Sequence, residues 1–405
     1  MTEKVMGAQT LATFEKALKE NYLPVWKNQL GIEPSALLSK IKKVPLKSDK
    51  IVATAPVGLS GGFGFGAEGA ATPAAGNVQF ERFETRAKDM YVNICISAKT
   101  VRLTGSGGAM ANALDTEVKA AYETAKWNTG RALFGNGTGV LTTFAAVSSA
   151  GNAIVVDDVS YLKEGLIVDI YAGEVADALA NPAALPVSTR RIKSVNRATK
   201  TIIVTGDAAT FAKGFITVQN SFNREITGLG AIFDENVTHI YGVEKATNPF
   251  LIPIAYNCDD DISDGILTKV LRMAKNDRNS NVDMLLCGDD AYDYYVEYLR
   301  TNNTRIEDMS HTISGGFKAI KFIFGNREVD LVNDSFVPAT EMWGVDTSAL
   351  ELHTQEWNFA DLQGGGIFNL MEGQSIYRAL LANYGDLICT NPGGCIRLTN
   401  VGYTA

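Results

Sequence analysis

Residues Asp283-Met-Leu-Leu-Cys-Gly288 run into Ala291-Tyr-Asp-Tyr-Tyr-Val-Glu-Tyr-Leu-Arg300, and a succession of short strand-like segments follows. A short apolar run that ends at a glycine is typical of a buried strand, and the next stretch has the length and spacing of a helix. This order predicts a lobe that mixes helices and strands. No reactive constellation stands out elsewhere in the chain, so the sequence favours a function that lies in shape and self-association.

The composition is that of a folded protein with more than one lobe. The chain has 405 residues, more than one hydrophobic core usually fills, so two or three lobes are expected. Apolar residues make up 46% and charged residues 20%, which argues against disorder. The net charge of -8 disfavours a protein whose main task is to grip phosphate, since that task needs clustered Lys and Arg.

The cysteines indicate neither a disulfide framework nor a zinc site. They are odd in number, scattered and never in a C-x-x-C pair, which fits a reducing cytoplasm. Their positions are Cys95, Cys258, Cys287, Cys389 and Cys395. The residues after Met1 lack the features of a secretory signal, and no apolar run approaches the roughly 18 residues of a membrane span, so no membrane partner is expected.

The first hundred residues predict an ordered N-terminal arm and a long excursion. Apolar spacing between Thr10 and Lys43 indicates two amphipathic helices. From Ile51 to Gly76 the chain is rich in Gly, Ala, Ser and Pro and cannot form a core alone. It returns through Val78–Arg86 and Met90–Ser97, where apolar and polar residues alternate, and we expect a long two-stranded hairpin.

A long helix, a β-rich insertion and a shorter helix are expected next. Ala109–Phe134 has apolar residues along one face, which predicts a helix roughly 35 to 40 Å long. From Leu141 to Phe222, short Val- and Ile-rich segments alternate with turn residues, which indicates a small, barrel-like β insertion. The main fold resumes at Ile226, and the segment Asp261–Lys275 predicts a helix capped by Asp261 or Ser263.

Two glycine motifs match enzyme patterns without their structural context. Ser60 lies in a G-x-S-x-G pattern, yet a nucleophile elbow needs a helix directly after the serine and a glycine run follows instead. None of His239, His311 and His353 lies in a motif that marks a triad. Gly64–Gly69 matches G-x-G-x-x-G, but no helix is predicted after it, so a flexible loop is favoured over a dinucleotide site.

Two further clusters are better explained by helix structure. Asp259–Gly265 resembles a calcium loop, but its glycine falls one place late and its twelfth position is Val270 instead of Glu. These carboxylates are more simply explained as caps of the following helix. Tyrosines within 292–298 could stack on bases, but they lie among acidic residues, so helix packing and inter-subunit contact are favoured.

Taken in order, these segments resemble the Hong Kong 97 fold of tailed-phage major capsid proteins. The pieces that carry the resemblance most specifically are Ile226-Thr-Gly-Leu229, Tyr241-Gly-Val-Glu244, Asp283–Gly288 with the Tyr-rich helix, Gly315-Gly316-Phe317 and Gly344-Val-Asp346-Thr-Ser-Ala-Leu350. The resemblance implies an α+β fold with an N-arm, an extended E-loop, a peripheral domain with a long spine helix, an axial domain and an inserted small β-barrel-like domain.

The resemblance also implies boundaries and site residues. The expected segments are the N-terminal arm 1–50, the E-loop hairpin 51–97, the peripheral domain with its spine helix 98–140, the β-rich insertion 141–222, the peripheral return 223–257, the axial domain 258–370 and the C-terminal peripheral strands 371–405. The E-loop tip is the expected assembly interface and comprises Gly61, Gly62, Phe63, Gly64, Phe65 and Gly66. Expected hinges are Gly105, Gly107 and Gly108.

The implied function is self-assembly, as hexamers and pentamers, into an icosahedral shell around a phage double-stranded DNA genome. Such a protein is a virion component assembled in the bacterial host cytoplasm, is not an enzyme and needs no cofactor or metal. An acidic wall lets packed DNA slide without sequence-specific binding. The resemblance leaves room for separate scaffolding, portal and decoration proteins, and the insertion is no part of the minimal fold.

Three other readings stay open. An encapsulin-like nanocompartment shares the fold but encloses enzymes. A serine hydrolase would use Ser60 beside a histidine in a pocket. A β-rich adhesin or tail component would carry secretion signals or fibre repeats, and the sequence shows neither.

Overall fold

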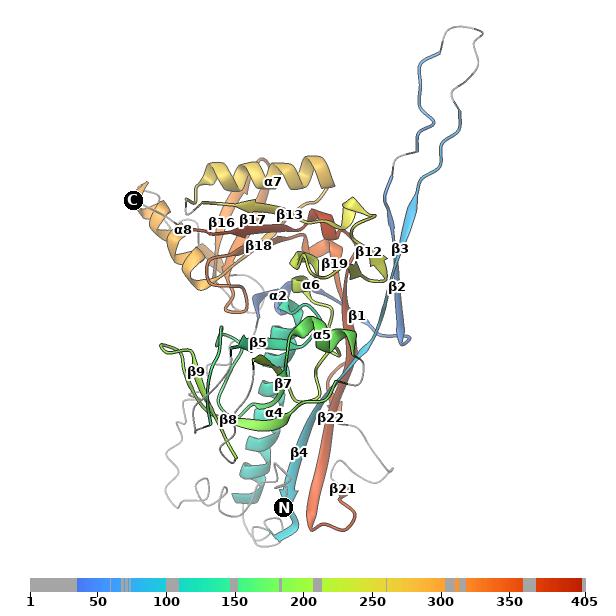
Figure 1. Cartoon of the computed structure of the whole chain (residues 1–405). Coiled ribbons are helices and arrows are strands. Elements are labelled where there is room, and N and C mark those ends of the chain that lie inside the picture. The colour runs from blue at the N-terminus through green and yellow to red at the C-terminus, as the bar shows by residue number, and fades with distance from the viewer. Residues whose placement is uncertain are drawn as a thin grey trace.

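The structure is a computed structural model, and it describes residues 35–58, 60–66, 69, 72, 74–99, 109–145, 152–181, 184–206, 213–259, 261–302, 310–312, 318–359 and 369–402. Four parts are distinguished in Figure 1: an upper lobe under α7, a long limb built on α4, a β lobe beside it, and a long hairpin that projects from the body. The α+β class expected from the sequence is confirmed.

The upper lobe is a mixed seven-stranded sheet with the order β13-β23-β18-β14-β17-β16-β15. Its strands are β13 (Ile254–Asn257), β14 (Met284–Cys287), β15 (Ser310–Thr312), β16 (Lys318–Phe324), β17 (Arg327–Asn333), β18 (Met342–Val345) and β23 (Ile396–Thr399), and its helices are α7 (Asp264–Arg278) and α8 (Asp289–Thr301). Strand β14 is buried throughout because its side chains alternate between two cores. Leu285 and Cys287 pack with α7 and α8, whereas Met284 and Leu286 join the main core below. The apolar run Met284–Cys287 is therefore a central strand of this sheet.

The long limb is organised by β22 (Ile376–Cys389), which pairs with four other strands. Its six-stranded sheet also contains β1 (Lys42–Pro45), β4 (Lys88–Ser97), β19 (Leu350–Thr354), β20 (Asn358–Phe359) and β21 (Asn369–Leu370). Helix α4 (Ala109–Phe134) lies along this sheet, and Ala121 packs on Ile94, Ile96 and Ala379 (Figure 1).

The β lobe is a six-stranded sheet with the order β5-β10-β7-β8-β9-β6 and its own hydrophobic core. It comprises β5 (Val140–Phe144), β6 (Ala153–Val155), β7 (Ile167–Ala172), β8 (Ser188–Asn196), β9 (Thr201–Val204), β10 (Gly214–Val218) and the short helix α5 (Val175–Ala180). The N–H of Asp157, just after β6, donates to the carbonyl of Thr143 at 3.0 Å, so the sheet curls until its two ends approach each other. Gly214 is required here, because a Cβ atom on it would lie 1.9 Å from the carbonyl oxygen of Tyr171.

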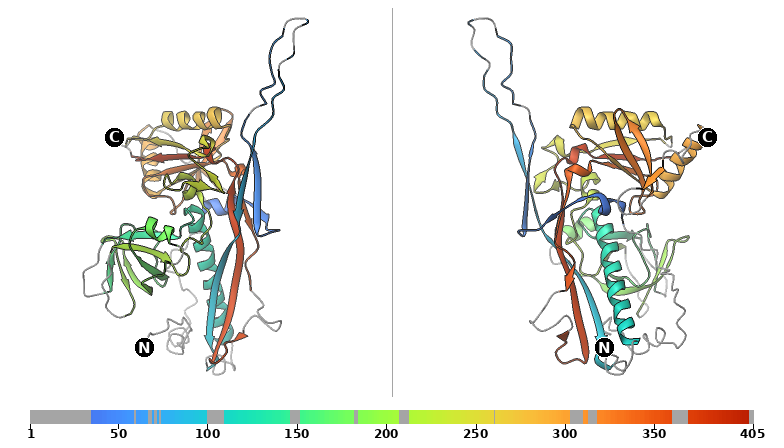
Figure 2. Two further views of the ribbon diagram at one scale, coloured as in Figure 1. Left: turned by 45° about the vertical axis from the view of Figure 1, so that its right-hand side comes forward. Right: turned by 180° about the vertical axis from the view of Figure 1, so that it is seen from behind.

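The long hairpin is formed by β2 (Lys50–Pro56) and β3 (Phe80–Arg86), which pair in register from Lys50↔Arg86 to Pro56↔Phe80. Figure 2 shows it projecting well beyond the upper lobe from both directions. The remaining short elements are α2 (Ala36–Lys40), α6 (Leu229–Phe233), β11 (His239–Ile240), β12 (Val243–Glu244) and the 3-10 turns η1 (Pro249–Leu251), η2 (Thr347–Ala349) and η3 (Pro392–Gly394).

Aromatic side chains join the parts of the body at one point. The ring of Phe336 lies 6.1 Å from that of Trp127 and 5.7 Å from that of Phe134, both on α4. Tyr161 of the β lobe stacks on the same Phe336 ring at 6.4 Å. Its hydroxyl also donates to the Phe336 carbonyl at 2.6 Å, so the β lobe is tied to the upper lobe and the limb here.

Replacing Tyr161 by Phe tests this connection. The ring contact is kept and one partly buried hydrogen bond is lost, so we expect the free energy of unfolding to fall by about 1 kcal/mol. Chemical denaturation of the unassembled subunit measures this change. A loss near zero would show that the hydroxyl does not help to hold the β lobe in place.

Several expectations hold and others need correction. Helix α4 has the predicted bounds, and the Tyr-rich segment is helix α8. The prediction that Met90–Ser97 forms a strand of the hairpin is wrong. This segment lies in β4, which pairs with β22 from Ser97↔Ile376 to Lys88↔Gly385. The helix expected to reach Lys43 ends at Lys40, and the chain continues as β1. The N-terminal helix before residue 35 lies outside the described residues.

The domain boundaries expected from the sequence do not coincide with the limits of the seven-stranded sheet in the upper lobe. Strands β13 and β23, assigned from the sequence to 223–257 and 371–405, both belong to the seven-stranded sheet. Conversely β19, β20 and β21, expected within 258–370, pair in the sheet of the limb. Ser263 is the N-cap residue of α7, but neither it nor Asp261 is seen to cap the helix with its side chain.

Candidate assembly interface

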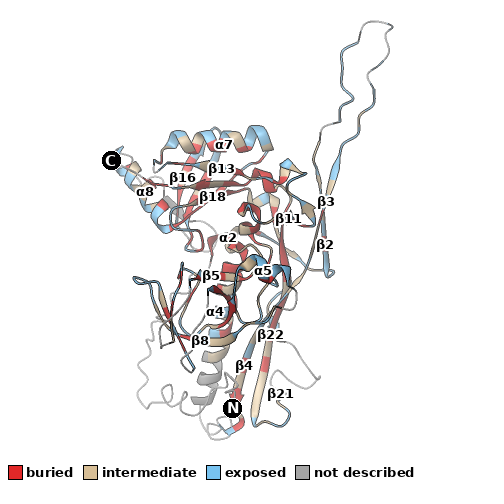
Figure 3. Ribbon diagram, in the orientation of Figure 1, coloured by how far each residue is buried: buried red, intermediate tan, exposed pale blue. Residues whose placement is uncertain are grey.

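The outer half of the long hairpin has no support from the rest of the described chain. Beyond the buried Ile51 and Phe83, its residues are largely exposed, as the pale blue of Figure 3 shows. Two of the exposed side chains there are apolar, namely Val78 and Phe80. A two-stranded ribbon is marginally stable alone in water, and exposed apolar area marks a contact surface. The hairpin therefore has the features of a segment that is completed by a partner.

The tip carries the strongest of these features. Phe63 is 82% exposed and Phe65 is 95% exposed, and their rings contact each other edge to face at 5.3 Å. A Cβ atom on Gly76 would lie 2.3 Å from the backbone nitrogen of Gly61, so the two sides of the loop approach as closely as glycine allows. The tip thus presents two phenyl rings on a narrow loop of backbone.

Ser60 does not lie in a nucleophile elbow. It is exposed in the loop of the hairpin, and its hydroxyl donates to the carbonyl of Gly76 at 2.9 Å. No helix follows it within 61–66, and His239 and His353 lie on β11 and β19. In the described part of the chain, Ser60 therefore lacks the strand-turn-helix context of a nucleophile elbow.

The other enzyme-like motifs also lack a site. Gly64 and Gly66 lie in neither a helix nor a strand, and none of the described residues between 69 and 79 is helical, so no helix N-terminus is seen there to bind a pyrophosphate. Asp259 accepts a hydrogen bond from the Asn257 amide at 2.7 Å, and Asp264 accepts one from Tyr295 at 3.0 Å. Over the described residues, no group of three or more His, Cys, Asp or Glu side chains is arranged to hold a metal ion.

The tyrosines of α8 serve packing inside the subunit, as predicted. Tyr295 is fully buried, and Tyr292, Tyr294 and Tyr298 are partly buried against the same core. Burial and the neighbouring Asp264 raise the pKa of the Tyr295 hydroxyl well above its usual value, which keeps it a hydrogen-bond donor. Whether the exposed edges of these rings contact another subunit stays a prediction.

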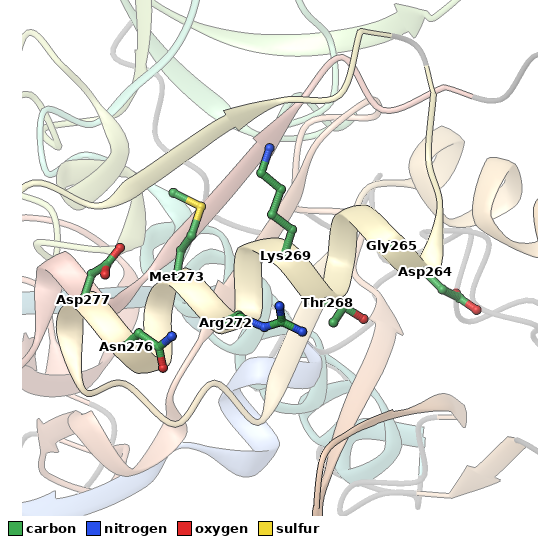
Figure 4. A pocket seen from close by; sticks show the side chains of 8 residues that line it. All are labelled: Asp264, Gly265, Thr268, Lys269, Arg272, Met273, Asn276 and Asp277. Atoms are coloured by element: carbon green, nitrogen blue, oxygen red, sulfur yellow. The ribbon is translucent and has the colours of Figure 1, made fainter.

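An open groove of about 450 Å³ runs along the outer face of α7. It is lined by Asp264, Gly265, Thr268, Lys269, Arg272, Met273, Asn276 and Asp277. In Figure 4, Lys269 and Met273 point to one side of the helix and Thr268 and Arg272 to the other. Most of the lining residues are polar or charged, with both signs present, and all of them come from α7 alone, so the groove lacks the converging walls of a small-molecule site.

A buried carboxylate anchors the start of the described chain to the upper lobe. Asp334, just after β17, accepts hydrogen bonds from the Ser35 hydroxyl at 2.8 Å and from the Ala36 N–H at 3.0 Å. Lys40 adds ion pairs with Asp283 and Asp330. Burial raises the pKa of Asp334 to about 6, although hydrogen bonds from Ser35, Phe336 and Ala36 oppose the rise. Helix α2 is therefore capped by a residue almost 300 positions away.

This raised pKa predicts a specific pH dependence. A carboxyl with a raised pKa contributes stability that is complete below its ordinary value and is lost as the pH rises through about 6. The wild type should therefore lose about 2 to 3 kcal/mol relative to Asp334→Asn between pH 4 and pH 7. Chemical denaturation of both unassembled proteins at each pH measures the difference. A difference that stays constant with pH would contradict the assignment.

The remaining expected site residues divide into two groups. Gly61, Gly62, Phe63, Gly64, Phe65 and Gly66 lie together at the exposed tip of the hairpin. Gly105, Gly107 and Gly108 lie outside the described residues. Sequence reasoning missed the buried carboxylates Asp334 and Asp386. A single charged residue within an apolar strand, as in Tyr384-Gly-Asp-Leu-Ile388, was the available signal, because such residues are seldom buried without hydrogen-bond partners.

The described helices offer no membrane span, because none of them is both long and apolar enough to cross a bilayer.

Comparison with known proteins establishes the fold. No family model matches the chain, and no curated protein matches its sequence. Among solved structures, the capsid asymmetric unit of cyanophage A-1(L) is similar with a TM-score of 0.56 and 11% identity, over 95% of this chain and 98% of that chain.

Two other shell structures are similar at a TM-score of 0.50. The holo-SrpI encapsulin complex from Synechococcus elongatus PCC 7942 is 10% identical over 99% of both chains. The capsid of a native GTA particle is 8% identical over 98% of this chain and 100% of that chain. The resemblance to phage capsid proteins is thus confirmed at the level of the fold, and the match covers nearly all of the chain.

Proposed function

We propose that this chain is the subunit of a closed protein shell, a major capsid protein of the Hong Kong 97 type. The observation that carries the proposal is the long hairpin with its exposed Phe63 and Phe65, on a chain that matches the fold of a capsid protein over 95% of its length. A single subunit leaves these rings in water, whereas a neighbouring copy can cover them. The hairpin is then the E-loop of the shell, and its tip is an assembly interface.

The energetics suit assembly by many weak contacts. Burying one phenylalanine side chain contributes roughly 1.5–3 kcal/mol, so one tip contributes only a few kcal/mol to a contact. In a closed shell every subunit makes and receives such a contact, and the linked contacts reinforce one another. A subunit can therefore remain unassembled when dilute and still form a stable shell when concentrated.

The finer roles of the other parts belong to the same proposal. Helix α4 and the sheet around β22 would form the peripheral domain, the upper lobe would form the axial domain at capsomer centres, and the β lobe would be an insertion. Hexamers and pentamers of the subunit would enclose double-stranded DNA, with scaffolding, portal or decoration proteins as separate chains. The net charge of -8 suits a wall that holds DNA without gripping it.

Electron microscopy of the purified protein, with its size distribution measured in solution, tests the proposal. Closed shells or capsomer rings are the expected result. A protein that stays monomeric across salt, pH and concentration would overturn the assignment.

A nanocompartment is the second candidate, because the encapsulin complex matches as much of the chain as the phage capsid does. The contents of shells formed in the original host separate the two functions. Nucleic acid inside supports the virus capsid, whereas a packaged enzyme would replace it with the nanocompartment.

A further inference from the structure

One buried carboxylate connects the base of the hairpin to the body. Asp386 on β22 has no exposed surface. Its Oδ1 accepts hydrogen bonds from the N–H of Thr227 at 2.8 Å and of Leu387 at 3.0 Å. Its Oδ2 accepts from the hydroxyl of Thr85 on β3 and from that of Thr227 at 3.3 Å. Three separate segments of the chain therefore meet at a single side chain.

Burying the Asp386 carboxylate costs free energy, and this cost indicates that the residue has a specific structural role. Burial raises the pKa of the Asp386 carboxyl, while the hydrogen bonds from Thr85 and Thr227 and the charge of Lys88 oppose the rise. Among the ion pairs of the described residues, none involves Asp386. A buried carboxylate without a paired cation is expensive, but its two oxygens accept several hydrogen bonds in set directions.

The surroundings of Asp386 hold the base of the hairpin to the body, and the half-buried Ala53 and Ala55 of β2 pack against the same core. Phe83 is fully buried, and its ring lies 6.0 Å from that of Tyr241. The N–H of Glu84 donates to the carbonyl of Tyr241 at 2.9 Å, and the N–H of Cys389 donates to the Tyr241 hydroxyl at 3.1 Å. Beyond Phe83 toward the tip, the hairpin is exposed or half-buried.

The hairpin is therefore fixed to the body at its base, and its tip projects away from the body. Extended chain from Thr85 to Gly76 spans roughly 30 Å at about 3.3 Å per residue. A rotation of about 10° at the base would move the far end by roughly 5 Å, more than the width of a phenyl contact. A small rotation of the backbone at Thr85 thus becomes a large displacement of Phe63 and Phe65.

We propose that Asp386 is the positioning residue of the hairpin: through Thr85 it sets and holds the direction in which the tip approaches a neighbouring copy. The approach to a neighbour rests on the proposed function, whereas the hold on the hairpin does not. Asp386 contacts no partner itself and acts only through the segments that it joins.

Replacing Thr85 by Val tests the proposal with little disturbance. The variant removes the bond between the hairpin and Asp386 and keeps the bonds from Thr227 and Leu387. Hydrogen exchange of the unassembled subunit should be about tenfold faster for residues 80–86, while the N–H groups of β4 in the limb and those of the upper lobe keep their protection. Assembly at limiting subunit concentration should fall by a similar factor.

Thr54→Val is the matched control, because it makes the same chemical change at an exposed position of β2. It should leave the exchange of residues 80–86 unchanged. Asp386→Ala should have a larger effect than Thr85→Val, but the test does not depend on it if that variant fails to fold.

Two results would overturn the proposal: unchanged exchange at the hairpin base in Thr85→Val, or a loss of protection spread equally over the whole subunit. If the wild type forms no shells at all, the proposed function fails, and the exchange data still decide the role of Asp386.

Discussion

Replacing Phe63 and Phe65 together by Ser is expected to abolish shell formation and to leave the subunit folded. Both rings are almost fully exposed and touch each other, so their loss removes no part of the core. In a shell, each subunit would lose two buried phenylalanines, or about 3 to 6 kcal/mol per contact. The association constant for that contact would fall by roughly a hundredfold or more.

The measurement compares the size distribution in solution, electron micrographs and the melting temperature of the wild type and the variant. Phe63→Leu with Phe65→Leu is the matched control, because it keeps an apolar tip and should retain part of the assembly. If the Ser variant formed normal shells, the tip would not be part of the assembly interface. A lower melting temperature of the dilute subunit would show that the rings serve its own fold.

Replacing Glu225 by Ala is expected to be among the most damaging single changes to the subunit. Its Oε1 lies 2.5 Å from Nη2 of Arg131 on α4, and the two side chains are only 9% and 5% exposed. The variant leaves the guanidinium buried without its counter-charge, and its Nε already lacks an acceptor in the described structure. An unpaired buried charge costs about 3–5 kcal/mol.

The double variant Arg131→Met with Glu225→Leu supplies the control. Replacing both members of a buried pair with apolar side chains is often close to neutral, so most of the lost stability should return. Chemical denaturation of the unassembled proteins measures all three free energies of unfolding. A loss below about 1 kcal/mol in Glu225→Ala would show that water reaches Arg131 when its partner is removed.

Helix α4 could be predicted with its observed bounds because its signals are local. Apolar residues recur at helical spacing from Val118 to Leu133, and glycine-rich segments stand before and after the helix. The same reasoning identified β14 as a strand, since an apolar run of that length ending at a glycine has few other uses. The exposed tip was also predictable, because glycine and phenylalanine together cannot form a core alone.

Strand β4 shows where local reasoning fails. Its alternation of apolar and polar residues says that it is a strand and which face is buried, but it does not say which strand pairs with it. A hairpin with the preceding segment was the simplest pairing along the chain. The actual partner is β22, almost 300 residues later, because its side chains complete the face that packs on α4.

The sequence by itself determined the class of fold, the positions of α4 and α8, and the exposure of Phe63 and Phe65, because each of these follows from neighbours within a few turns of chain. Only the tertiary structure decided the pairing of β4, the capping of α2 by Asp334, the pairing of Arg131 with Glu225 and the joint at Asp386. These features join residues about a hundred to three hundred positions apart. A buried charge is tolerated only where folding brings its hydrogen-bond partners to it, and no local pattern encodes which distant residues those will be.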